Sequence, residues 1–324
     1  GEQLVLNWHE QMKKLGVKVI YECTAIGLIH NESTGVTGVR ARHQGEEHEL
    51  TAKSVILACG SFESNAEMRA RYLGPGWDLA KVRGTSYNNG AGLNMALDLG
   101  AMPYGHFSGA HAVAWDLNAP PYGDITIGDQ FQKHNVPFAV VVNANGERFR
   151  DEGEDFHSYV YARYGGEILQ QPGMYAFQIF DAKVQHLLRS EYRCRFLTKY
   201  TGNTIEELAE KMEGANAANG VKTVKEFNEA CRTDIPFDPN VHDGRCTEGL
   251  ALNKSNWANP IDEPPFDAYA VTAGVTFTFG GVKVSGQTEV ERSDGSIIKG
   301  LYAAGEMVGG LYFHGYARGT GLMA

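Results

Sequence analysis

Apolar residues near the start of the chain change their spacing from a helical to an extended pattern. From Leu4 to Leu15 an apolar residue recurs every three or four positions, which predicts a helix with one apolar face. Gly16 is expected to end this helix, and residues 17–20 are expected to begin a strand. The residues that share the apolar face are Leu4, Trp8, Met12 and Leu15.

The next apolar runs predict short strands. Residues 38–41 and 47–50 form the two arms of a small predicted hairpin. Residues 54–60 are a short apolar run stopped by glycine, which is the form of a buried parallel strand. A helix, a strand, a hairpin and a buried strand in this order suit the tail of a dinucleotide-binding α/β domain.

A second helical segment spans residues 88–100. Leu93, Ala96 and Leu97 make its apolar face. Residues 89–92 give the start of this helix a glycine-rich turn, which can cradle an anion at the helix N-terminus.

From about residue 106 the chain becomes rich in aromatic residues and irregular. Residues 138–142 are strand-like, and capping boxes at residues 204–207 and 223–226 predict the starts of two helices. This pattern indicates a separate α+β module, and a proline-rich stretch beginning at Pro260 marks its exit.

The composition of the 324-residue chain narrows the class of ligand. Its 39 glycines are about 12% of the residues against a typical ~7%, and they cluster in short motifs. Such clusters favour tight turns and close approach of the backbone to a ligand. The net charge of -10 argues against a binder of nucleic-acid phosphates but leaves room for an anionic substrate at a local cluster.

The cysteine pattern is typical of free thiols in a reducing compartment. No two cysteines have the CxxC spacing and their number is odd, so neither a disulfide framework nor a zinc or other metal site is expected. No run of about 18 apolar residues predicts a transmembrane segment, and no signal peptide is visible, so we expect a cytoplasmic protein. The cysteines are Cys23, Cys59, Cys194, Cys231 and Cys246.

Four motifs occur in one order along the chain. They lie at residues 55–62, 145–152, 278–281 and 300–321, and the last is the strongest signal because it is the longest. Together these motifs resemble those of the fumarate reductase/succinate dehydrogenase flavoprotein family. The resemblance covers nearly the whole chain.

The resemblance implies an α/β fold in which a Rossmann-like FAD-binding domain is interrupted by an inserted α+β capping domain. Residues 1–105 and 266–324 would form the FAD-binding domain, and residues 106–265 would form the cap. The family's FAD-binding domain opens with a strand and a GxGxxG turn that binds the FAD pyrophosphate. No such turn precedes residue 1 and a closing helix should begin at Ala324, so we expect a chain that is N- and C-terminally incomplete.

The resemblance also assigns residues to the FAD site. The turn Ala58-Cys59-Gly60 resembles the turn that runs beside the dinucleotide. Glu306, which follows Gly305, resembles the acid that hydrogen-bonds a flavin-side hydroxyl, and a carboxylate suits this role because it accepts from two hydroxyls at once. The glycines expected to let the backbone approach the isoalloxazine ring are Gly309, Gly310, Gly319 and Gly321.

His314 and Arg318 resemble the pair with which the family binds a substrate carboxylate. An arginine can grip a carboxylate with two parallel hydrogen bonds. Two positions depart from fumarate reductases, because Phe156 stands where they carry a catalytic arginine and Phe277 where they carry a histidine. Fumarate reduction as such is therefore not expected.

Residues 151–159 look closer to tricarballylate dehydrogenase, a relative that oxidises a tricarboxylate to an alkene by passing hydride to FAD. His157, Tyr161 and Arg163 lie in or next to this segment and are candidates for substrate binding or proton transfer. A helix with polar surface positions explains these three residues equally well.

The combined prediction is an FAD-dependent oxidoreductase acting on a CH–CH bond next to carboxylates, with a small carboxylate substrate and an electron acceptor or donor as partner. Two alternatives stay open: a 3-ketosteroid dehydrogenase-like flavoprotein, and an inactive folded fragment that does not retain FAD. Arg318 separates the two enzymes, because an apolar steroid gives a guanidinium nothing to pair with. A flavin absorption measurement separates the fragment from both.

Overall fold

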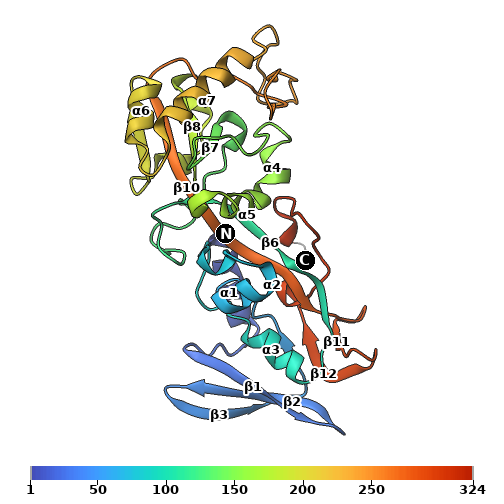
Figure 1. Ribbon diagram of the computed structural model, residues 1–324. Helices are drawn as coiled ribbons and strands as arrows, with labels where there is room; N and C mark the ends of the chain where they lie inside the picture. Colours follow the sequence, from blue (N-terminus) through green and yellow to red (C-terminus); the bar gives the residue numbers. More distant parts are fainter. Residues whose placement is uncertain (1, 323–324) are drawn as a thin grey trace.

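Two long antiparallel strands run along the molecule and join its two ends (Figure 1). The computed structural model describes residues 2–322. The two strands are β6 (Pro103–Asp116) and β10 (Phe266–Val282), which lie far apart in the sequence. Their pairing is irregular after Val275 and again after Thr278, and such irregularities bend a strand and redirect its side chains. This bent part of β10 lines the cavities described below.

One end of this two-stranded ribbon, here called the cap end, is built into a larger sheet with short helices around it. The sheet has the order β5-β10-β8-β7, and β9 also pairs with β10. α6 begins where its capping box predicts, because the Thr204 hydroxyl accepts a hydrogen bond from the Glu207 backbone N–H at 3.0 Å. The elements are β5 (Lys81–Val82), β7 (Val140–Asn143), β8 (Ala176–Phe180), β9 (Lys199–Gly202), α4 (His157–Val160), α5 (Tyr164–Leu169), α6 (Ile205–Lys211) and α7 (Ala217–Ala230).

The other end combines segments from the start and the finish of the chain. β4 pairs in parallel with β12, which confirms the parallel strand predicted at residues 54–60. Only one face of β4 is covered, since Ile56 is 66% exposed while Val55 and Leu57 are buried. β2 and β3 form the predicted hairpin, to which β1 adds a third antiparallel strand. The elements are β1 (Cys23–Asn31), β2 (Gly35–His43), β3 (Glu46–Thr51), β4 (Val55–Leu57), α2 (Ala66–Leu73), α3 (Ala91–Asp98), β11 (Glu289–Glu291) and β12 (Ile297–Ala303).

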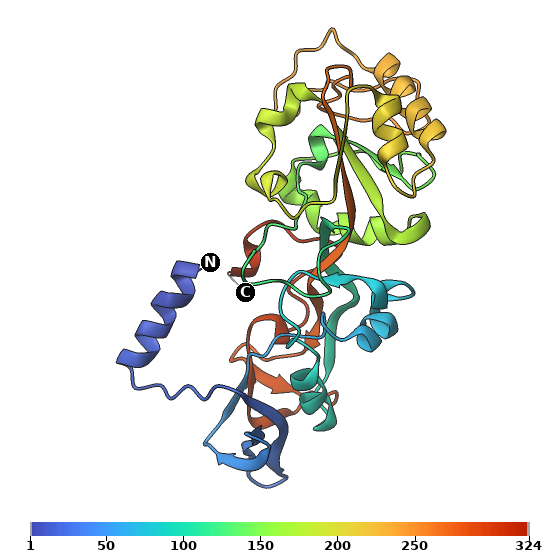
Figure 2. The same ribbon diagram turned by 90° about the vertical axis from the view of Figure 1, so that its left-hand side faces the viewer.

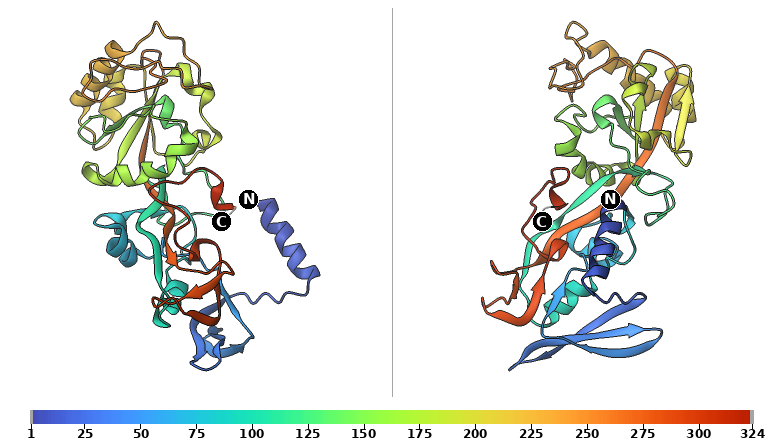
Figure 3. Two further views of the ribbon diagram at one scale, coloured as in Figure 1. Left: turned by 90° about the vertical axis from the view of Figure 1, so that its right-hand side faces the viewer. Right: turned by 180° about the vertical axis from the view of Figure 1, so that it is seen from behind.

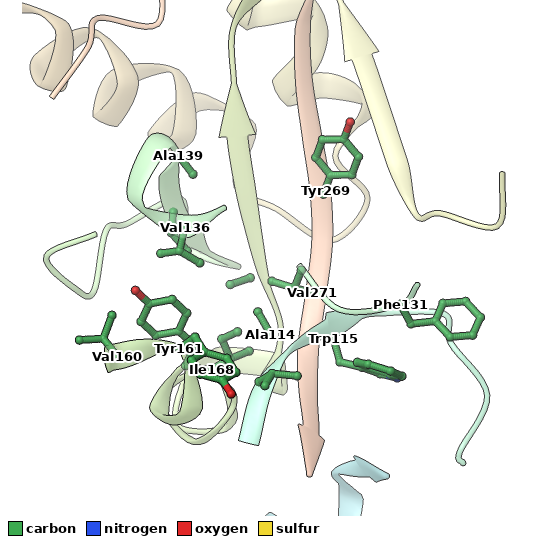
Figure 4. Close-up of a cluster of buried hydrophobic side chains, with 14 of the residues drawn as sticks. Ala114, Trp115, Phe131, Val136, Ala139, Val160, Tyr161, Ile168, Tyr269 and Val271 are labelled. Atoms are coloured by element: carbon green, nitrogen blue, oxygen red, sulfur yellow. The ribbon is translucent and has the colours of Figure 1, made fainter. Parts of the chain in front are cut away.

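Separate hydrophobic cores support the two ends. The core drawn in Figure 4 lies where the ribbon enters the cap end, and it includes Trp115, Tyr161, Tyr269 and Val271. Burying a large apolar side chain stabilises the fold by about 1.5–3 kcal/mol. Tyr161 is therefore held in place by packing, which matters because it also lines one of the cavities described below.

The strand predicted at residues 17–20 is wrong. α1 (Glu2–Lys14) is a helix, and Gly16 follows it in the left-handed region at φ 71°, but residues 17–20 form no strand. They pair with no other strand among the described residues, and a strand needs a partner to satisfy its backbone. The predicted apolar face of α1 is also uncovered, since Trp8 is 64% exposed. Figures 2 and 3 show α1 standing apart from the rest of the molecule.

The helix start predicted at residues 223–226 is also wrong. α7 begins at Ala217, because the Asn216 side chain accepts a hydrogen bond from the Asn219 backbone N–H at 3.1 Å. Thr223 lies inside the helix, and its hydroxyl instead donates to the Gly146 carbonyl at 2.6 Å. The side chain that caps the helix therefore lies seven residues before the predicted one.

The predicted mixed α/β class is confirmed by this arrangement. The proposed domain boundaries fall inside β6 and at the start of β10, and they stay a prediction. Within the described part of the chain, no helix combines the length and the apolar character that a membrane span requires.

Candidate functional site

A first cavity of about 260 Å³ opens beside the bent part of β10. Two of its acidic residues come from the turns that follow neighbouring parallel strands, Glu63 after β4 and Glu306 after β12. The carboxyl ends of parallel strands meet at one edge of a sheet, and this edge is where α/β proteins bind ligands. Apolar side chains also line the first cavity, among them Phe277, Phe279, Leu311 and Tyr312.

Glu63 and Glu306 form a carboxyl pair in this cavity. Glu306 Oε1 accepts a hydrogen bond from the Thr278 backbone N–H at 2.8 Å, and Glu63 Oε1 accepts one from Asn88 Nδ2 at 2.5 Å. Burial, together with the neighbouring Glu63 charge, raises the pKa of Glu306 to about 9. Burial also raises the pKa of Glu63. The pair therefore holds a proton at neutral pH and can donate a hydrogen bond as well as accept one.

The predicted dinucleotide turn does not line this cavity but approaches Asn88, which does. Ala58 and Cys59 are exposed, and Gly60 has a left-handed φ of 72°. A side chain at Gly60 would overlap the Asn88 amide, so glycine is required for the turn to approach Asn88. The turn thus holds in position a residue that binds Glu63.

The glycines of the last motif fall into two groups. Gly305 and Gly321 line the first cavity, and Gly319 lines a second cavity. Gly309 and Gly310 instead pack against Tyr104 of β6, where an added side chain would overlap the backbone or the ring. These two glycines let the last segment lie directly on the ribbon.

The second cavity, of about 510 Å³, shares the lining residues Thr276 and Phe277 with the first cavity. Arg318 is in its wall and makes no ion pair with an acid of the described residues, whereas Arg83 is paired with Asp129. The additional lining residues used below are His111, Tyr161 and Tyr316. The second cavity therefore presents an uncompensated positive charge beside aromatic side chains.

Tyr161 and His111 supply neutral polar groups to the second cavity. Burial raises the pKa of Tyr161 to about 12, so its hydroxyl is a hydrogen-bond donor at neutral pH. Burial lowers the pKa of His111 to about 3, so its imidazole is uncharged. The two rings meet edge to face with centroids 5.0 Å apart.

An imidazole lies beside Phe277 even though the sequence has no histidine there. His111 of β6 is the cross-strand partner of Phe277, and the two rings stack with centroids 5.1 Å apart. Both His111 ring nitrogens are buried and have no hydrogen-bond partner in the described chain. A ligand in the second cavity can provide that partner.

Three of the predicted substrate residues are not brought into this cavity. His314 is exposed, and its backbone N–H donates to His106 Nδ1 at 3.1 Å. Arg163 lies on the surface in an ion pair with Glu154 at 2.6 Å. His157 lines a third cavity, and its ring lies edge to face against that of Tyr161, which lines the second cavity. Arg318 and Tyr161 are thus the two predicted substrate residues that line the same cavity.

Sequence reasoning missed Glu63, Asn88, Arg83 and His111. Glu63 lies just beyond the first motif at residues 55–62, so reading the motif one residue further offers a signal for it. Arg83 and His111 reach the second cavity because β5 and β6 pair with the distant β10, and Asn88 reaches the first cavity through its hydrogen bond with Glu63. The local sequence carries no signal for these contacts.

The comparisons with known proteins agree with a flavin site. Residues 1–323 match the model of a protein family described as FAD binding domain. The chain is a flavoprotein by family, and it belongs to this FAD-binding family. The cofactor of the family is FAD.

Relatives within the family carry out different reactions according to their names. A probable fumarate reductase, Ifc3, of Shewanella frigidimarina is 30% identical, and the match covers 98% of this chain and 50% of that protein. A 3-oxosteroid 1-dehydrogenase of Mycobacterium tuberculosis is also 30% identical, and the match covers 94% of this chain and 57% of that protein. Both names denote oxidoreductases, and the chain spans about half the length of each relative.

The fold agrees with a solved structure of the same group. The open conformation of a flavocytochrome c3 fumarate reductase superposes with a TM-score of 0.72 at 26% identity. The match covers 96% of this chain and 50% of that one.

The residues of the first cavity fit FAD. Glu63 Oε2 and Thr278 Oγ1 are buried without a hydrogen-bond partner in the described chain, so they can bind hydroxyl groups. A side chain at Gly305 would meet open space, so the backbone there is accessible to a flat ring. The aromatic wall at Phe277 and Phe279 suits the apolar face of such a ring.

Proposed function

We propose that this chain carries the flavin and substrate sites of an FAD-dependent oxidoreductase that acts on a carbon–carbon bond next to carboxylate groups. The observation that carries this proposal is the position of Arg318, whose cavity shares Thr276 and Phe277 with the cavity that fits FAD. A carboxylate bound at Arg318 would place its neighbouring carbons against this shared wall. The leading substrate class is a small di- or tricarboxylate such as tricarballylate.

Different residues of the second cavity contribute different interactions with such a substrate. Arg318 is the charged group that is free to pair with a carboxylate, because Arg83 is already held by Asp129 through Nε at 2.8 Å. Tyr161 donates a hydrogen bond to the substrate, since its raised pKa keeps it protonated. His111 adds an uncharged imidazole to the wall of the same cavity, where it can hydrogen-bond the substrate without bringing a further charge. When bound, FAD supplies the hydride-transfer chemistry.

A second candidate function is oxidation of a 3-ketosteroid. The aromatic residues Tyr161, Phe277 and Tyr316 of the second cavity favour it, because such a surface also suits a steroid ring system. The Mycobacterium tuberculosis relative carries this kind of name. The charged Arg318 opposes it, since a steroid provides no carboxylate.

Replacing Arg318 separates these candidates. We expect Arg318→Ala to lower turnover of tricarballylate with FAD and an artificial electron acceptor by about a hundredfold or more, because a charge-assisted pair is lost. Arg193→Ala is the matched control, since Arg193 is exposed and lines none of the three cavities. Carboxylate turnover that survives Arg318→Ala, or steroid turnover by the unmodified chain without carboxylate turnover, would reject the proposal.

A further inference from the structure

The last segment of the chain contributes to the first and second cavities within a few residues. Tyr312 lines the first cavity, and Tyr316 and Arg318 line the second. Between them the chain makes a tight turn, in which the Gly315 N–H donates to the Phe313 carbonyl at 2.7 Å. A shift of this turn would therefore move side chains of both cavities.

The centre of this turn has a strained backbone. His314 has a φ of 60°, in the left-handed region that residues other than glycine seldom adopt. Such a conformation persists only where the surrounding structure holds it in place. Here the His314 N–H donates to His106 Nδ1 at 3.1 Å. Within the described chain, this is the hydrogen bond that ties residues 311–317 to β6.

An irregularity of β6 presents His106 to the turn. Ala110 and His106 pair with consecutive residues of β10, so residues 107–109 bulge out of the ladder. A bulge re-aims the side chains beside it. Gly109 leaves room for the imidazole, since a side chain there would overlap His106 Nδ1. The bulge and this glycine together allow the ring to reach the turn.

The imidazole of His106 is suited to accept this hydrogen bond. Its ring lies against those of Phe313 and His314, with both centroids 4.6 Å away, and 6.2 Å from that of Phe279. Burial and the neighbouring His314 lower the pKa of His106, so the ring is uncharged at neutral pH. Accepting at Nδ1 places the ring proton on Nε2.

We infer that His106 is a positioning residue, whose Nδ1 holds the turn at His314 and thereby keeps Arg318 in place for the substrate carboxylate. The inference rests on the proposed function and adds to it a residue that lines neither the first nor the second cavity. Arg318 has a further anchor, because its N–H donates to the Ser158 carbonyl at 3.0 Å. Loss of the His106 hydrogen bond should therefore weaken the site without abolishing it.

Two variants separate the acceptor atom of His106 from the packing of its ring. His106→Phe keeps a ring and loses the acceptor, whereas His106→Asn loses the ring and keeps an acceptor close to the position of Nδ1. We expect His106→Phe to weaken tricarballylate binding to the FAD-supplemented chain by roughly three- to tenfold in calorimetry, because one hydrogen bond is lost. His106→Asn should stay within about twofold of the wild type. His186→Asn is the control, since His186 is exposed and lines none of the three cavities.

Hydrogen exchange reports on the turn without any ligand. We expect amide exchange over residues 311–318, followed by mass spectrometry, to be faster in His106→Phe than in the wild type and unchanged in His106→Asn. The inference is overturned if His106→Phe behaves like the wild type, or if His106→Asn loses as much as His106→Phe, because ring packing would then be what holds the turn. If the unmodified chain binds no tricarballylate, the proposed function is wrong, and the exchange rates still decide the role of His106.

Discussion

Glu306 holds a proton at neutral pH, and this property makes stability depend on pH. Its pKa is about 9 in the folded chain and near the ordinary 4.5 in the unfolded chain. Between these values the unfolded state releases a proton that the folded state keeps, so stability falls as the pH rises. The stability linked to Glu306 is fully present below about pH 4.5 and is lost as the pH rises towards about 9.

Replacing Glu306 by glutamine should remove this dependence. An amide oxygen still accepts from the Thr278 N–H, but the side chain cannot ionise. We expect Glu306→Gln to be more stable than the wild type at about pH 8, by on the order of 2 kcal/mol, and the difference to shrink towards about pH 5. Thermal unfolding across this pH range measures it, with Glu10→Gln on the exposed α1 as control. Curves that stay parallel at every pH would mean that the folded carboxyl is ionised.

Gly309 is required by packing. A methyl group at this position would overlap the Tyr104 carbonyl oxygen, which belongs to the backbone of β6 and cannot move freely. We expect Gly309→Ala to destabilise the chain by roughly 1–3 kcal/mol, seen as a lower midpoint of denaturant unfolding. Gly286→Ala is the matched control, because a methyl group there meets no atom within 4 Å. Equal midpoints for the two variants would refute this close packing.

At the scale of secondary-structure elements, α7 depends on a cap that the sequence pattern did not reveal. Asn216 satisfies the Asn219 N–H at the first turn of the helix. We expect Asn216→Ala to reduce the free energy of unfolding by about 1 kcal/mol. Lys222→Ala tests the same helix on its exposed face and should change little, because its ion pair with Glu226 is exposed and long at 3.8 Å. A larger loss in Lys222→Ala than in Asn216→Ala would contradict the assigned helix start.

Local signals explain which elements could be predicted. The start of α6 follows from Thr204 and Glu207, which interact within one turn, so the sequence alone carries it. At its true start α7 lacks the acidic residue that completes a capping box. A sequence with the capping-box pattern begins further along, at Thr223, and led to the wrong helix start. Residues 17–20 have strand-like composition, but a strand exists only where a partner pairs with it.

At the scale of the whole molecule, the site was predictable only in part. Glu306 and Arg318 were found because they stand in a long motif near the end of the chain, and they line the first and second cavities. Glu63 and His111 reach the same cavities through pairing of β4 with β12 and of β6 with β10. Strand pairing over such separations is not encoded in any short stretch, so His111 could not be assigned from the sequence, whereas Glu63 lies one residue beyond the first motif.

Although the net charge of the chain is -10, positive charge is concentrated in one region of it. Arg83, Arg318 and Arg189 lie around Tyr161, and Asp129 and Glu191 are the acids beside them. We expect this arrangement to attract an anionic substrate to a molecule whose net charge is negative. Within this group, Arg318 is the residue on which the proposed carboxylate substrate class rests.

The visible spectrum of the purified chain tests this account most directly. FAD is added, unbound FAD is removed by desalting, and tricarballylate is then added in the absence of oxygen. We predict flavin absorption bands that survive desalting and lose intensity with tricarballylate, and bands that survive without this loss in Arg318→Gln. Bands that are insensitive to carboxylates and bleach with a 3-ketosteroid would contradict the assigned substrate class, and a colourless protein would contradict an FAD site in this chain.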